Sequence, residues 1–384
     1  MKFKKIILLS SAISLIPIAS LAFSMNSIHD KNFEIALEKS NELLNRLYNE
    51  KQKYKFYTYI KDEEGNKYIY IQFEKRFIIY DLNLKKIIQI TQSYHKKDII
   101  NKSIYVFGED IKDPNLQDKE SFKIDLNKDT FESIPNISNV IKNAWWWASR
   151  NTIEKIGYIQ TRDFRPGESV GMCEYIALSN LLLYNELFTS STIFTDEEFN
   201  KYFELSKGES DIFESSPVFR NYGLKNPKES LPYKLWKLNN EKLNLWEISS
   251  YYLPVTRFMV GKMGSFIFES DYKIGAYYWK TIEHIKNNNP VIVTTTKTMH
   301  SFVVYGYDEK SEMLLINWLW GGRRSITLLN YWKLSESASP LKLFYTLKTK
   351  PKNFPTNFRK VFHYNNEYFT GNEMTKIYEN QRKI

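Results

Sequence analysis

The spacing of apolar residues changes near residue 50, and this change separates a predicted helix from a predicted sheet. Between residues 30 and 50, apolar side chains recur every three or four positions, as on the buried face of a helix. From residue 54 onward, short runs of β-branched and aromatic residues alternate with turn-forming sequences. The predicted strands are 54–60, 68–73, 77–80 and 86–91, with further strands at 103–107 and 121–124. We therefore predict a helix packed on an antiparallel sheet.

A second apolar segment predicts a mostly buried helix that begins at Cys173. Loop-forming residues 165–171 precede it, and apolar side chains then cover a wide face as far as Phe188. Farther along, the apolar runs 290–296, 300–308 and 313–316 predict three strands. His300 then begins the second strand of a hairpin, and Asn317 directly follows the third.

These patterns divide the chain into an α+β arrangement of several parts. Residues 30–138 form a β-rich N-terminal domain with no obvious chemical constellation, and the segment 134–137 is a connector. Residues 143–347 form a second domain that carries the chemical motifs. Residues 348–384 are polar, contain two prolines and are expected to wrap the surface or fray.

The composition excludes several classes of function. The chain has 384 residues, of which 42% are hydrophobic, enough for a substantial core. One cysteine permits no internal disulfide, no cysteine-rich zinc finger and no iron–sulfur cluster. The five histidines include no pair at i, i+4, and neither a P-loop nor a G-x-G-x-x-G motif occurs. We therefore predict no metal site and no cofactor.

The net charge of +10 does not by itself indicate a nucleic-acid partner. The 54 lysines and arginines are scattered among 44 acidic residues and form no basic runs. Lysine, asparagine and isoleucine are abundant, which is typical of an AT-rich coding genome. We predict no nucleic-acid binding.

The first 24 residues predict the compartment. Three lysines within the first five residues precede an uncharged, mostly apolar stretch from residue 6 to residue 24. This is the pattern of a signal peptide, and the stretch is also long enough for an uncleaved membrane anchor. Either alternative places the remainder outside the cytoplasm, as a secreted or cell-surface, membrane-anchored protein. Its lone thiol then has no disulfide partner in the chain.

The thiol, an imidazole and an amide form a candidate catalytic set. Cys173 lies at the first turn of the predicted helix, where the helix dipole favours the thiolate over the thiol. A lone buried cysteine is often only a small apolar side chain. A nucleophilic thiol needs a base and a group that orients the base, and His300 and Asn317 are candidates for these roles. Trp318 and Trp320 would shield their hydrogen bond from water.

These motifs resemble those of the papain-like cysteine peptidases. The resemblance rests on Gly171-Met172-Cys173 at the start of a buried helix, on the run 300–308 and on the run 317–322. It is strongest to the streptopain-type bacterial branch. The segments 145–147, 157–159 and 170–188 are also similar to those of predicted cysteine peptidases of mollicutes.

The resemblance implies a fold, an activity and residue roles. The fold would be a papain-like peptidase domain with a helical part and an antiparallel β part. The chain would be a thiol protease, a hydrolase of polypeptide substrates, with Cys173 as nucleophile, His300 as base and Asn317 as orienting group. The N-terminal domain would occupy the place of a propeptide, so the protein would be made as a zymogen.

One departure from the family pattern concerns the oxyanion donor. Papain-like enzymes place a glutamine about six residues before the cysteine, and this chain has none there. Gln160 and Ser169 are the remaining candidates, beside the backbone N–H of Cys173. Glu168 and Glu174 are expected to be solvated charges rather than catalytic acids.

Two other functions fit the same sequence. The same site on a related fold would serve a thiol acyltransferase, a transglutaminase or an amidase, because fold does not determine the acyl acceptor. The missing glutamine is also compatible with an inactive surface protein that binds peptides.

Overall fold

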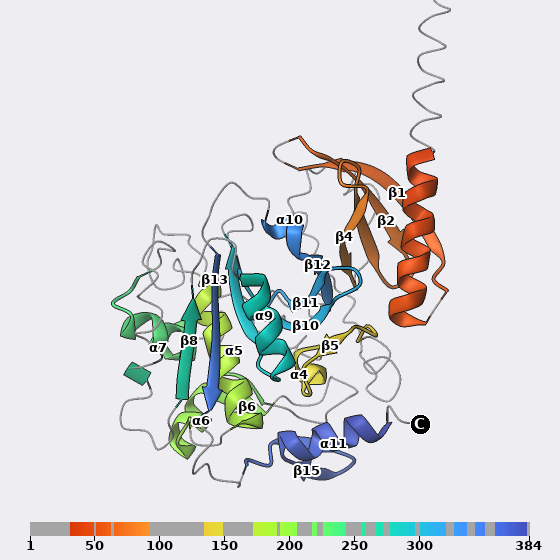
Figure 1. The fold of residues 1–384 in the computed structure, drawn as a ribbon. Coiled ribbons are helices and arrows are strands. Elements are labelled where there is room, and N and C mark those ends of the chain that lie inside the picture. The colour runs from red at the N-terminus through yellow and green to blue at the C-terminus, as the bar shows by residue number, and fades with distance from the viewer. Residues whose placement is uncertain are drawn as a thin grey trace, which may run out of the picture.

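A computed structural model shows a mixed α+β protein in which helices pack on a long antiparallel sheet (Figure 1). It describes residues 31–49, 51–62, 65–92, 134–148, 172–189, 193–205, 217–220, 226–242, 255, 257–258, 266–271, 277–295, 300–319, 326–335, 342–349 and 358–381. Within these residues, one sheet contains eleven strands. No helix in this part of the chain is long and apolar enough to span a bilayer.

The N-terminal part has the predicted helix and strands. A helix covers residues 31–48 and buries its apolar stripe, with Ala36, Leu44 and Leu47 almost inaccessible to solvent. Beside it, four strands form an antiparallel meander (Figure 1). They are β1 (Tyr54–Lys61), β2 (Lys67–Phe73), β3 (Phe77–Asp81) and β4 (Lys86–Thr91). These bounds confirm the predicted strands to within one residue, because alternating turns and β-branched runs delimit each strand locally.

The sheet continues from the N-terminal strands into the strands that carry the candidate site. β4 pairs with β12 (Thr327–Asn330), with Thr91 opposite Thr327. Beyond β12 the order is β11 (Met313–Asn317), β10 (His300–Asp308), β9 (Val291–Thr295), β13 (Lys342–Thr349) and β8 (Phe266–Asp271), and β5 (Asn139–Val140) pairs with β10. The pairing of β4 with β12 crosses the predicted division between residues 138 and 143, and that division stays a prediction.

Helix α5 (Cys173–Phe188) is the central helix of the second part. All its residues except Cys173 are buried, as expected for a helix that is apolar on nearly every side. It packs against β10 and against α7 (Leu231–Leu238). The other helical elements are α4 (Ala144–Ala148), α6 (Asp196–Tyr202), α9 (Tyr277–Lys286), α10 (Tyr331–Ser335) and the 3-10 helix η4 (Pro227–Glu229), and a small sheet joins β6 (Phe203–Leu205) to β7 (Pro217–Phe219).

The C-terminal residues are more ordered than their polar sequence predicts. In place of a tail, residues 358–381 contain a hairpin and helix α11 (Gly371–Gln381). The hairpin strands are β14 (Phe362–Tyr364) and β15 (Glu367–Phe369). Phe362 and Tyr378 are buried against Trp145. The sequence of this segment is mostly polar because only one face of α11 is buried.

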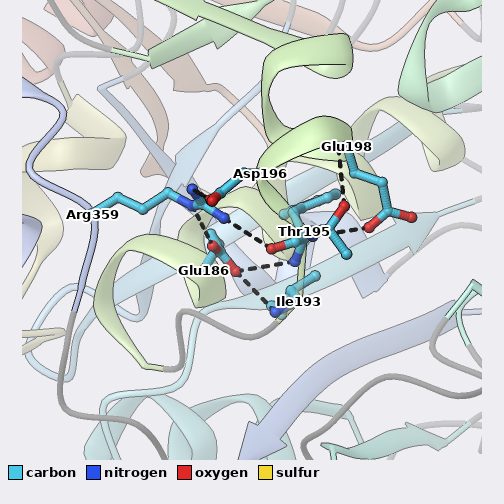
Figure 2. Close-up of polar contacts among 7 residues, drawn as sticks. Glu186, Ile193, Thr195, Asp196, Glu198 and Arg359 are labelled. Atoms are coloured by element: carbon cyan, nitrogen blue, oxygen red, sulfur yellow. Dashed lines mark hydrogen bonds and ion pairs between the residues drawn. The ribbon is translucent and has the colours of Figure 1, made fainter.

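An arginine of this C-terminal segment anchors the end of α5 (Figure 2). Arg359 donates from Nε to the buried carboxylate of Glu186 at 2.9 Å and also bonds to Asp196 of α6. The other oxygen of Glu186 accepts from the backbone N–H groups of Ile193 and Phe194 at 2.9 and 3.3 Å. These contacts fix the end of α5 opposite Cys173.

Several predicted features lie outside the described residues. They are the N-terminal segment 1–24, the strands 103–107 and 121–124, the segment 157–159, Gln160, Glu168, Ser169 and Trp320.

Candidate active site

The sulfur of Cys173 lies where the buried helix α5 meets the start of strand β10. Cys173 is the first residue of α5, and the carbonyl of Met172 accepts the first helical hydrogen bond, from the N–H of Ile176 at 3.0 Å. Cys173 is a free, partly buried cysteine. Its position at the start of a helix agrees with the sequence-based prediction.

Ser301 lies beside the Cys173 sulfur. Hydrogen bonding from its backbone N–H and its hydroxyl lowers the pKa of the Cys173 thiol, which favours the thiolate. The hydroxyl also lies 2.6 Å from the hydroxyl of Thr294 on the paired strand β9. Ser301 directly follows His300, so the thiol and the imidazole-bearing end of β10 are brought together. Sequence reasoning missed Ser301, although it stands beside the predicted base.

Burial of Cys173 disfavours the thiolate. Burial raises the pKa of Cys173 well above its ordinary value, and the negative charge of Glu174 raises it further. The hydrogen bonds from Ser301 lower the pKa without reversing the shift. This differs from the expectation that a helix start favours the thiolate. Desolvation and the adjacent carboxylate outweigh the helix dipole here.

Glu174, which directly follows Cys173, is buried and is not a solvated charge. Its side chain is buried, with 6% of the residue exposed, and burial raises the pKa of its carboxyl to about 7. Hydrogen bonding from its own backbone N–H and from the Cys173 thiol lowers the pKa of this carboxyl but does not reverse the shift. The expectation of a solvated charge was wrong because α5 is buried from its first turn. The only feature of the sequence that singles out Glu174 is its position directly after the cysteine.

The ring of His300 is buried beside Trp318. Its Nε2 lies 2.7 Å from the backbone carbonyl oxygen of Trp318, and the two rings are 5.8 Å apart. A carbonyl can only accept a hydrogen bond, so Nε2 carries a proton. In the neutral ring Nδ1 is then the basic nitrogen. The imidazole is therefore oriented by a backbone group.

The Asn317 side chain binds two backbone groups. Its Nδ2 donates to the carbonyl of Trp147 at 2.8 Å, and its Oδ1 accepts from the N–H of Leu319 at 2.7 Å. Leu319 has a positive φ of 60°, so this bond stabilises a sharp turn after β11. The carbonyl of Trp318 thus occupies the position, next to the imidazole, that the resemblance assigns to Asn317.

The surroundings of the imidazole and the available metal ligands describe the remainder of the site. Trp318 is buried, with its ring also 5.0 Å from that of Phe302, so it covers one side of the imidazole. Among the described residues, no group of three or more histidine, cysteine, aspartate or glutamate side chains is placed to hold a metal ion. The reactive and polar groups of this site are the thiol of Cys173, the imidazole of His300 and the carboxyl of Glu174. The N–H and hydroxyl of Ser301 are the hydrogen-bond donors beside them.

No family model matches the chain, and no curated protein matches its sequence. Among solved structures, a fragment of prointerpain A from Prevotella intermedia is similar to 76% of this chain over 98% of its own length. The sequence identity is 9% and the TM-score 0.38. The likeness is distant, and it does not establish a common fold.

Proposed function

We propose that this chain is a cysteine-type endopeptidase that uses Cys173 as nucleophile and His300 as base. The observation that carries the proposal is the meeting of Cys173 with Ser301, the residue next to His300. A partly buried thiol at a helix start, donors that favour the thiolate and an oriented imidazole are what a thiol peptidase requires.

In this mechanism the proton of the thiol passes to Nδ1 of His300, which gives a thiolate and an imidazolium. The thiolate attacks the carbonyl carbon of a peptide bond, and backbone N–H groups at the start of α5 stabilise the oxyanion. The imidazolium then protonates the leaving amine. Water, deprotonated by the neutral imidazole, hydrolyses the thioester and regenerates the thiol.

The proposal extends to the compartment and to activation. We propose that residues 1–24 direct the chain out of the cytoplasm as a signal peptide or a membrane anchor. The N-terminal part would then be the propeptide of a zymogen. Gln160 and Ser169 stay the candidate side-chain donors to the oxyanion, and Trp320 a candidate shield of the imidazole.

The test is incubation of the purified protein with an unfolded polypeptide, with and without a thiol-specific inhibitor. Mass spectrometry would identify the cleaved bonds and any cut within the chain itself. Cys173→Ala and His300→Ala should abolish cleavage, whereas His363→Ala should not, because His363 lies in the C-terminal hairpin. Cleavage that persists in Cys173→Ala would refute the proposal. Transfer to an added amine, without hydrolysis, would indicate an acyltransferase.

A further inference from the structure

Helix α11 contacts the short helix α4 through one buried hydroxyl group. The side chain of Thr375 is buried, and its Oγ1 accepts a hydrogen bond from the indole Nε1 of Trp145 at 3.0 Å. The hydroxyl donates to Oδ1 of Asn143 at 2.8 Å and to the carbonyl oxygen of Gly371 at 2.9 Å. Asn143 directly precedes α4, so Thr375 binds this helix both at its first turn and just before its start.

Helix α4 depends on its neighbours for its position. It has only five residues, and so short a helix is not stable by itself. The ring of Trp145 packs against the rings of Phe362 and Tyr378 in the C-terminal segment. The ring of Trp147 stacks on that of Tyr184 in α5, with ring centres 5.5 Å apart. The C-terminal segment and α5 therefore hold α4 between them.

The end of α4 binds the turn that orients the imidazole. Trp147 lies in the last turn of α4, where backbone carbonyls need partners outside the helix, and its carbonyl accepts from Nδ2 of Asn317 at 2.8 Å. Oδ1 of the same side chain accepts from the N–H of Leu319 at 2.7 Å. Between these two residues, the carbonyl oxygen of Trp318 lies 2.7 Å from Nε2 of His300. A displacement of α4 would therefore move the group that binds the imidazole.

We propose that Thr375 is a positioning residue for His300, which acts through α4 and Asn317. This inference deepens the proposed function and rests on it, because His300 is the proposed base. The C-terminal segment 358–381 is then part of the support of the active site. Packed elements and their hydrogen bonds carry coupling of this kind.

The role of Thr375 follows from what its hydroxyl satisfies. Without this hydroxyl, the indole N–H of Trp145 and Oδ1 of Asn143 each lose a hydrogen-bond partner in a buried site. Buried polar groups that lose a partner shift to find another, and α4 would move with them. The bond from Asn317 to the end of α4 would then break more often, and so would the bond from Nε2 of His300 to its carbonyl acceptor.

The inference is tested by the exchange of the Nε2 proton of His300 with water. NMR of the full chain with ¹⁵N-labelled histidine measures this exchange, and the signal is identified by its absence in His300→Gln. Thr375→Val removes the hydroxyl but keeps the shape of the side chain. It should speed the exchange about tenfold, as expected for the loss of a buried hydrogen bond. Thr375→Ser keeps the hydroxyl and should exchange as slowly as the unsubstituted protein.

The matched control is Thr91→Val in β4. Thr91 is also buried, and its hydroxyl oxygen likewise accepts from a side-chain N–H, that of Gln89 at 3.0 Å. This substitution removes an equivalent hydroxyl from the N-terminal part of the sheet and should leave the exchange at His300 unchanged. Unchanged exchange in Thr375→Val, or equal acceleration in Thr91→Val, would overturn the inference.

The unsubstituted protein offers a second measurement that does not depend on how the variants fold. In hydrogen exchange at increasing urea, the backbone N–H of Leu319 and those in the middle of α11 should become exposed in the same unfolding step. Protection of Leu319 that survives the opening of α11 would overturn the inference. Neither measurement needs peptide cleavage. A protein that passes both but cleaves no polypeptide would refute only the proposed function.

Discussion

Arg46, near the end of the N-terminal helix, forms a two-point ion pair with Asp308, the last residue of the strand that begins at His300. Its two guanidinium nitrogens lie 3.1 and 2.6 Å from the two carboxylate oxygens. Asp308 is 1% exposed and also accepts from Ser311. This ion pair therefore joins the N-terminal helix to the end of β10, and Cys173 lies near the start of the same strand.

Arg46→Ala should destabilise the protein by about 3 kcal/mol, because it leaves a buried carboxylate without its cation. Urea unfolding at neutral pH, followed by tryptophan fluorescence, measures the change. Glu42→Ala removes an exposed charge from the same helix and should change stability by less than about 0.5 kcal/mol. Equal effects of the two substitutions would show that the ion pair does not hold the helix.

The Arg46–Asp308 ion pair should also affect how the free energy of unfolding changes at acid pH. Burial tends to raise the pKa of Asp308, but hydrogen bonds from Arg46 and Ser311 outweigh it, and the net pKa lies below its ordinary value. Such a group stabilises the fold above its ordinary pKa and loses this effect as the pH falls through the lower, folded pKa. The stability difference between Arg46→Ala and the unsubstituted protein should therefore shrink below about pH 4. A constant difference down to pH 2 would contradict this.

Glu174 should give the opposite pH dependence. Its folded pKa of about 7 lies above the ordinary 4.5, so its contribution is fully present below pH 4.5 and is lost as the pH rises to 7. The loss amounts to roughly 3 kcal/mol. Glu174→Gln should flatten the stability profile between these pH values, as measured by urea unfolding at each pH. If the stability of Glu174→Gln fell as steeply with pH as that of the unsubstituted protein, a group other than Glu174 would cause the pH dependence.

Asn317→Ala should destabilise the protein by about 2 kcal/mol or more, because a buried carbonyl and a buried N–H lose their partner. Thermal unfolding tests this, with Asn200→Ala on the exposed face of α6 as control. If Asn317 served only to orient the base, the variant would lose activity at unchanged stability. The two roles are thus separated by one pair of measurements.

Gly371→Ala should be destabilising despite the better helix propensity of alanine. A Cβ at this position would lie 2.5 Å from a ring carbon of Phe188 and 2.7 Å from the carbonyl oxygen of Leu187. Overpacking of this kind outweighs a propensity gain of about 1 kcal/mol, since the backbone oxygen cannot turn away. We expect a net loss of about 1–2 kcal/mol in urea unfolding. Asn372→Ala, one residue later in the same helix, should have a much smaller effect.

Local patterns in the sequence predict the N-terminal helix and strands and the elements that carry the candidate site. The helix before β1, the four N-terminal strands, α5, β9, β10 and β11 all begin and end near the predicted residues, because turns and apolar periodicity are local signals. The continuation of the sheet from β4 to β12 was not predicted, since it pairs residues more than 230 positions apart. The buried face of α11 was missed for the same reason, because its partners lie in α5 and around Trp145.

At the site, the sequence predicts which chemical groups belong but not how they bond. Cys173 and the start of β10 come together, and Ser301 and Glu174 shift the pKa of the thiol in opposite directions. The amide of Asn317 binds backbone, and a backbone carbonyl orients His300. Residue types in a motif do not encode backbone partners or burial, and burial is the largest cause of the raised pKa of both Cys173 and Glu174. The roles assigned to Cys173, His300 and Asn317 stay predictions.

The pairing of β4 with β12 has a consequence for any processing of the chain. Three sets of contacts join the N-terminal part to the rest of the chain. They are the hydrogen bonds between these strands, the buried ion pair of Lys333 with Asp81 at 2.9 Å and the ion pair of Arg46 with Asp308. A nick between β4 and β5 would therefore yield two polypeptides that co-purify as one particle and separate only in denaturant. Severing the backbone and releasing the fragment would be distinct events.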